Sequence, residues 1–147
     1  MKADVIVIGA GIVGACCAHY CAQAGLSVIV VDRGSVAGGT TGAGEGNILV
    51  SDKEPGPELD LALLSRELWS QMAGELGDSF ELDAKGGLVV AARADTLDHL
   101  HRFADEQARG GVIAEPVTTE GLVEHEPHIS RELLGGVYYP QDMQVQP

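Results

Sequence analysis

Runs of apolar residues alternate with glycine-rich turns in the first third of the chain. Residues 4–8 (DVIVI) and 28–32 (VIVVD) are almost continuously apolar and rich in β-branched side chains. Such runs are typical of strands that are buried on both faces of a parallel sheet. Between them, residues 12–24 are small and apolar, and Gly25 follows as a helix-stop signal. The pattern therefore predicts a βαβ unit.

The rest of the chain alternates helical and extended patterns. We expect helices over residues 57–76, over residues 94–109, and from Thr118 or Thr119 to Pro127. We expect strands on both sides of the Lys85–Gly87 turn within residues 80–92, and another over residues 135–140. The first of these helices carries an apolar stripe that we expect to face the core, with Trp69 beside it: Leu61, Leu64, Leu68, Met72 and Leu76.

The change of pattern near residue 80 predicts two domains, residues 1–80 and residues 81–147. The predicted fold class is α/β, with a Rossmann-like βαβ domain followed by the start of a domain with a mixed or antiparallel sheet.

Charge and hydropathy narrow the function classes. The 147 residues include 22 acidic and 9 basic side chains, a formal net charge of −13. Because nucleic acids are polyanions, this charge argues against a nucleic-acid partner. No stretch reaches the apolar length of a transmembrane segment. We therefore expect a soluble cytoplasmic protein.

Cysteine and histidine positions do not form a metal pattern. Cys16, Cys17 and Cys21 fall on the first predicted helix, where we interpret them as small hydrophobic residues. No Cys/His cluster has zinc-like spacing, so we expect no metal site. His99 and His101 fall on the polar side of a helix and are interpreted as solvated.

The turn between the first strand and the first helix carries the motif with chemical meaning. Gly9, Gly11 and Gly14 fit GxGxxG, in which the glycines permit a tight turn, close approach of a pyrophosphate, and close packing of helix on strand. Backbone N–H groups at the start of the helix then favour the binding of a phosphate group. Asp32 ends the second strand, where the fingerprint expects an acid that accepts the ribose hydroxyls. The sequence predicts a dinucleotide site.

The loop over residues 34–46 bears on which dinucleotide binds. Thr40 and Thr41 offer hydroxyl and amide donors to a pyrophosphate, and the loop glycines allow backbone to lie against a flat ring: Gly42, Gly44 and Gly46. A nicotinamide-binding unit would usually continue to a third parallel strand after a short helix. The loop therefore favours FAD, and an NAD-dependent dehydrogenase domain stays open as an alternative.

Four segments in this order resemble the FAD-dependent amine and amino-acid oxidoreductases, which include glycine oxidase, D-amino-acid dehydrogenase, sarcosine oxidase, and the flavoproteins of opine oxidase and hydrogen cyanide synthase. They are VIVIGAGIVGACCAHYCAQAGLSVIVVDR, GGTTGAGEGNILVS, KGGLVVAA and YYPQDMQVQP. The GEGN sequence is closest to the last two flavoproteins. The resemblance implies an FAD domain over residues 1–80 and the start of a substrate domain over residues 81–147.

The resemblance also implies roles for individual residues. Those implied to line the FAD pyrophosphate are Gly9, Gly11, Ile12, Val13 and Gly14. Asp32 and Arg33 would meet the adenosine ribose and its neighbourhood. The phosphate and ribityl loop would be Thr40, Thr41 and Gly42, and the residues implied to approach the flavin ring are Gly44, Glu45, Gly46 and Asn47. No catalytic residue is assigned.

The implied reaction is oxidation of the C–N bond of an amino acid or secondary amine, by hydride transfer to flavin N5 and hydrolysis of the imine. Complete family members are more than twice as long as this chain. The resemblance therefore implies that the chain is the N-terminal part of such an enzyme, and that a C-terminal half or a partner subunit completes the site. A non-catalytic flavin-binding fragment or subunit is the remaining alternative.

Overall fold

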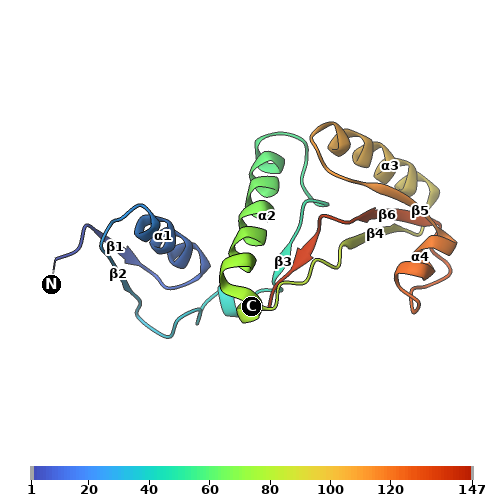
Figure 1. The fold of residues 1–147 in the computed structure, drawn as a ribbon. Helices are drawn as coiled ribbons and strands as arrows, with labels where there is room; N and C mark the ends of the chain where they lie inside the picture. The colour runs from blue at the N-terminus through green and yellow to red at the C-terminus, as the bar shows by residue number, and fades with distance from the viewer. Residues whose placement is uncertain (1, 147) are drawn as a thin grey trace. The chain divides into compact units, whose positions relative to one another are not determined.

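The computed structural model describes residues 2–146, which form two compact units (Figure 1). The first unit covers residues 2–45 and the second covers residues 46–146. The division between these units follows Glu45. The predicted domain boundary near residue 80 stays a prediction.

The first unit is the predicted βαβ arrangement. Its elements are β1 (Val5–Ile8), α1 (Ile12–Gln23), β2 (Val28–Val31) and a 3₁₀ turn over Thr41–Ala43. β1 and β2 are parallel, with Val5 opposite Val28 and Ile8 opposite Val31. The two strands and the helix confirm the hydrophobic pattern to within one residue at each end.

The burial of β1 and β2 differs from the expectation. We expected strands covered on both faces, but Ile8 is 87% exposed, and Ile6, Val30 and Val31 are exposed as well. The reason is that within residues 2–146 this sheet consists of two strands, and α1 is the helix that packs on them. The apolar sequence is that of a covered sheet, whereas the described chain covers it only in part.

The second unit is built around a three-stranded antiparallel sheet. Its elements are β3 (Asn47–Ile48), α2 (Pro57–Leu76), a 3₁₀ turn (Gly77–Phe80), β4 (Gly87–Ala91), α3 (Ala94–Arg109), β5 (Glu115–Thr118), α4 (Thr119–His125), β6 (Gly135–Tyr139) and β7 (Met143–Gln144). β6 lies between β4 and β5, and β3 pairs with β7. α3 lies along one side of this sheet, as Figure 1 shows.

The helices agree with the sequence pattern, and one strand does not. The predicted helices correspond to α2, α3 and α4, and Thr118 caps α4 by accepting a hydrogen bond from Gly121 N. The predicted hairpin around Lys85–Gly87 is wrong, because β4 pairs with β6 and not with residues 80–84. Glu81 has a φ of 51°, which breaks an extended run, and Asp83 forms only an isolated bridge to Gln144.

The expected core stripe of α2 is wrong for three of its five residues, while Leu68 and Met72 are half-buried. Leu61 is 65% exposed, and Leu64 and Leu76 are exposed as well. The helix instead buries Leu59 and packs Ala62 and Leu63 against the core. Leucine occurs nearly all round the first half of this helix, so spacing alone did not identify the buried side. The buried cluster itself comprises Val50, Leu59, Leu100, Ala104, Val112, Val137 and Tyr139.

Among residues 2–146, none of the helices is both long and apolar enough to cross a membrane.

Candidate cofactor site

The glycine turn after β1 is shaped by two close approaches. Gly9 has a φ of 109°, a conformation that favours glycine, and its N–H donates to Val31 O at 2.8 Å. A Cβ atom on Gly14 would lie 1.9 Å from Gly9 O and 3.3 Å from Val7 Cγ1. Only glycine fits there, because α1 starts directly against the turn. The packing role predicted for Gly14 is thus visible in the geometry.

Asp32 joins the glycine turn to the loop that follows β2. Its Oδ2 accepts a hydrogen bond from Ala10 N at 2.7 Å, and its Oδ1 accepts one from Gly34 N at 2.8 Å. These two bonds, with a smaller effect of the Arg33 charge, hold the pKa of the Asp32 carboxyl below its ordinary value. A carboxylate offers about four lone-pair positions, so Asp32 can still accept from two hydroxyl groups.

The Gly/Thr loop is tied to the start of α1. Thr41 Oγ1 accepts a hydrogen bond from Ile12 N at 3.0 Å, and a Cβ on Gly11 would lie 2.9 Å from the same oxygen. The loop is further fixed by Ala37 N, which donates to Ala10 O at 3.0 Å, and by Gly42 N, which donates to Ala37 O at 3.0 Å. The Thr41 hydroxyl retains its own proton for donation.

The first turn of α1 adds the electrostatics of a helix N-terminus. Ala15 N is the first donor that bonds within this helix, to Gly11 O at 2.9 Å. The N–H groups of Val13 and Gly14 precede it, and such groups have no partner inside a helix. Together with the helix dipole they favour an anion at this position.

A surface hollow of about 440 Å³ lies beside the turn, lined by Ile8, Gly9, Val31, Asp32 and Arg33. Twelve of the fourteen predicted residues lie in this first unit. They are Gly9, Gly11, Ile12, Val13, Gly14, Asp32, Arg33, Thr40, Thr41, Gly42, Gly44 and Glu45. Gly46 and Asn47 belong to the second unit. There Gly46 O accepts from Val145 N at 2.9 Å, and Asn47 pairs with Gln144.

The geometry fits a dinucleotide. The close glycines, the anionic acid after β2 and the helix N-terminus occur in one unit, at the positions where the fingerprint places them. The sequence did not reveal the backbone amides of Ala10 and Gly34 as partners of Asp32, because a backbone donor carries no residue signature.

Within residues 2–146 no group of His, Cys, Asp and Glu is arranged to hold a metal. Cys16 and Cys21 are half-buried and Cys17 is exposed, and burial raises the pKa of the Cys16 thiol. The interpretation of His101 as solvated is wrong, since its Nε2 is buried without a hydrogen-bond partner. His101 lies one helical turn after Leu97 and three residues before Ala104, so it borders the buried side of α3.

Solved structures share the fold. Glycine oxidase from Bacillus cereus ATCC 14579 superposes with a TM-score of 0.88 at 30% identity, covering 99% of this chain and 40% of that one. An L-α-glycerophosphate oxidase from Mycoplasma pneumoniae, solved with FAD bound, superposes with a TM-score of 0.87 at 20% identity, which shows the fold alone.

Curated relatives with similar sequences are also longer than this chain. Glycine oxidase from Geobacillus kaustophilus is 28% identical over 97% of this chain and 40% of its own length. One component of the anaerobic glycerol-3-phosphate dehydrogenase from Haemophilus influenzae is 29% identical over 95% of this chain and 24% of its own length. The chain therefore spans well under half of these relatives. Residues 4–147 match the family described as FAD dependent oxidoreductase (DAO), and the chain belongs to this family.

Proposed function

We propose that the full-length protein oxidises the C–N bond of an amino acid or secondary amine with FAD as its cofactor. The observation that carries the cofactor assignment is the meeting of three segments in one unit. Asp32 bonds the glycine turn through Ala10 N, and Thr41 bonds the start of α1 through Ile12 N. The family match favours FAD over the nicotinamide alternative.

Different residues of the first unit would bind different parts of FAD. The amides of Val13 and Gly14, with the N-terminal end of α1, would bind the pyrophosphate. Asp32 would accept the ribose hydroxyls while keeping its bonds to Ala10 and Gly34. Thr40 and Thr41 would add hydroxyl donors from the loop. Bound FAD supplies the two-electron acceptor, and the protein contributes binding, orientation and electrostatics.

The remaining predicted residues keep their proposed roles. Gly9 and Gly11 would let backbone approach the pyrophosphate, and Arg33 would lie near the adenosine. Those that would follow the cofactor toward its ring are Gly42, Gly44, Glu45, Gly46 and Asn47. Support for these roles comes from the family resemblance and from the fixed loop geometry.

The substrate class rests on relatives. Two glycine oxidases and a D-amino acid dehydrogenase from Paramagnetospirillum magneticum match nearly the whole chain, the last at 28% identity over 46% of its own length. The names of these three relatives give amino acids as their substrates. A second candidate is oxidation of a phosphorylated alcohol, because the glycerol-3-phosphate dehydrogenase component matches equally well.

Two measurements on the purified full-length protein test the proposal. Calorimetric titration of flavin-free protein with FAD, and separately with NAD, is expected to show saturable binding of FAD alone. Turnover is then compared between a panel of amino acids and secondary amines and glycerol 3-phosphate. Preferred turnover of glycerol 3-phosphate would replace the amine proposal by the second candidate, and NAD binding without FAD binding would refute the cofactor assignment.

A partner subunit gives a different result in the same experiment. Bound FAD without turnover, together with a second polypeptide that co-purifies and restores activity, would identify the protein as a flavin-binding subunit.

A further inference from the structure

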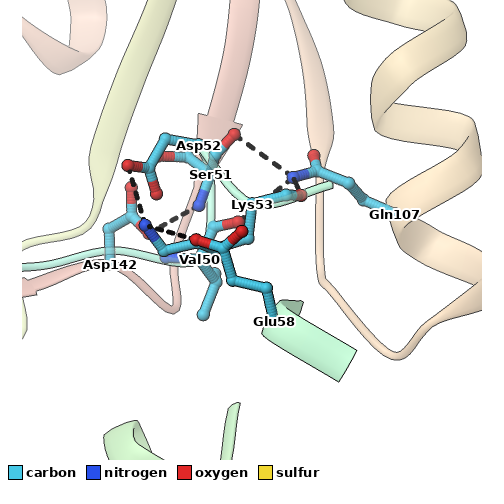
Figure 2. Close-up of polar contacts among 7 residues, drawn as sticks. All are labelled: Val50, Ser51, Asp52, Lys53, Glu58, Gln107 and Asp142. Atoms are coloured by element: carbon cyan, nitrogen blue, oxygen red, sulfur yellow. Dashed lines mark hydrogen bonds and ion pairs between the residues drawn. The ribbon is translucent and has the colours of Figure 1, made fainter. Parts of the chain in front are cut away.

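The segment between β3 and α2 is held by side chains from distant parts of the chain. Residues 49–53 follow β3, and within them Val50 and Ser51 are buried. Lys53 N donates to Val50 O at 3.2 Å, which makes this segment a tight turn. Figure 2 shows Asp142 and Gln107 approaching it.

Asp142 supplies acceptors to this turn. Its Oδ1 accepts from Val50 N at 2.8 Å and from Ser51 N at 3.2 Å. Asp142 directly precedes β7, which pairs with β3 through Ile48 and Met143. The carboxylate therefore continues the contact between these strands past the point where their backbone pairing stops.

Gln107 supplies donors to the carbonyl groups of the same turn. Its Nε2 lies 3.1 Å from Val50 O, 3.2 Å from Ser51 O and 2.8 Å from Lys53 O. Tyr139 Oη donates to Gln107 Oε1 at 2.9 Å, and this bond fixes which end of the amide faces the turn.

Both side chains are almost completely buried, Gln107 at 0% and Asp142 at 2% exposure. Burial of a polar group is costly unless its hydrogen bonds are made, and a fully bonded buried network specifies one arrangement. The bonds from these two side chains to the turn join positions that are between 54 and 92 residues apart in the sequence. The turn thus has one defined position within the second unit.

The turn over residues 49–53 lies just after Gly46 and Asn47, two residues of the proposed flavin site. Gly46 and Asn47 are proposed to approach the flavin ring, and they are paired with the residues that follow Asp142. Asn47 and Lys53 further border a groove of about 400 Å³ along α2. Movement of the turn would therefore move both the proposed flavin residues and this groove.

We propose that Gln107 and Asp142 are positioning residues of the flavin site, which set the location of Gly46 and Asn47 by fixing the turn over residues 49–53. This inference rests on the proposed function. Neither side chain is assigned a contact with cofactor or substrate. They act through the backbone to which they bond.

The test uses the full-length FAD-bound protein with the variants Gln107→Met and Asp142→Asn. Methionine preserves length but removes the amide, while asparagine retains one oxygen acceptor and removes the charge. Gln71→Met is the matched control, because Gln71 is an exposed residue of α2 whose amide bonds, among the described residues, the Glu67 side chain on the same helix. The flavin absorption spectrum, the flavin midpoint potential and the thermal unfolding temperature are measured for each protein.

We expect FAD to remain bound in both variants and its midpoint potential to shift. The expected change is threefold or more in the ratio of affinities for reduced and oxidised flavin, which corresponds to about 14 mV for a two-electron couple. Asp142→Asn is expected to shift less than Gln107→Met, and Gln71→Met should match wild type. If one variant fails to fold, the other decides.

An unfolding temperature that falls while the spectrum and potential stay at wild-type values would overturn the inference, since the network would then support the fold alone. A wild-type protein that binds no FAD would instead overturn the proposed function, and this inference with it. The two failures are therefore distinguishable.

Discussion

Replacing Gly14 by alanine tests the contact on which the cofactor site depends. The added Cβ would lie 1.9 Å from Gly9 O, about 1 Å less than the 3.0 Å below which such contacts essentially do not occur. The opposing atom belongs to the backbone, so no side chain can rotate away. We therefore expect α1 to move away from the glycine turn.

The magnitude follows from two effects. Forcing extra volume into a packed site costs about 1–3 kcal/mol of folding free energy. A hydrogen bond to a charged group contributes about 1.5–3 kcal/mol. Because the Val13 and Gly14 amides would lose their alignment with the pyrophosphate, loss of one such bond lowers FAD affinity roughly ten- to a hundredfold.

The assay is FAD titration of flavin-free full-length protein, with urea unfolding measured in parallel. Gly39→Ala is the control, because its Cβ meets nothing within 4 Å and its backbone does not have a positive φ. We expect the control to bind FAD like wild type. Wild-type FAD affinity in Gly14→Ala would refute the assignment of this turn to the pyrophosphate.

Three further predictions concern charge, burial and packing. The bonds from Ala10 and Gly34 lower the pKa of Asp32 in the folded state, so its ionised form stabilises the fold above the unfolded pKa, and this stability is lost as pH falls through the folded pKa. Asp32→Asn should therefore lower the unfolding temperature at pH 7, and the difference from wild type should shrink on acidification to pH 3. A difference that stays constant with pH would contradict this. Burial, with a smaller effect of the Asp142 charge, raises the pKa of Tyr139 to about 12, so the folding stability should fall as pH rises from about 10 toward 12. Absorbance of the tyrosinate form should show one titration at high pH, which Tyr139→Phe removes. In the 147-residue chain, Leu59→Ala should cost about 2–5 kcal/mol in urea unfolding and Leu64→Ala about 0.5 kcal/mol or less, and equal costs would show that the exposed side of α2 is covered.

The elements that could be predicted are those whose local signals agree. Pro57 at the first position of α2 and Gly77 after its end mark that helix in the sequence, and GxGxxG with Asp32 marks the cofactor turn. These signals act over a few residues and do not depend on what packs against them. The same holds for Thr118 as the cap of α4.

The features that could not be predicted depend on tertiary partners. Gln107 lies seven residues after Leu100 and three after Ala104, on the buried side of α3, but helical spacing does not show that a polar side chain there is fully buried. It is buried because its amide bonds three carbonyl groups and Tyr139. β7 has only two residues, which is too short for a periodic pattern. Asp142 lies in a corner between strands, where the sequence gives no indication that two amides more than 90 positions away will be its partners.

The two-stranded sheet of β1 and β2 has a consequence for handling the 147 residues on their own. A pair of parallel strands has two outer edges, and an uncovered edge is a template for pairing with another chain. Ile6 and Ile8 add exposed apolar surface on one face of the same sheet. Concentrated solutions of the isolated 147-residue chain should therefore self-associate, and a polypeptide that covers this sheet should reduce the association.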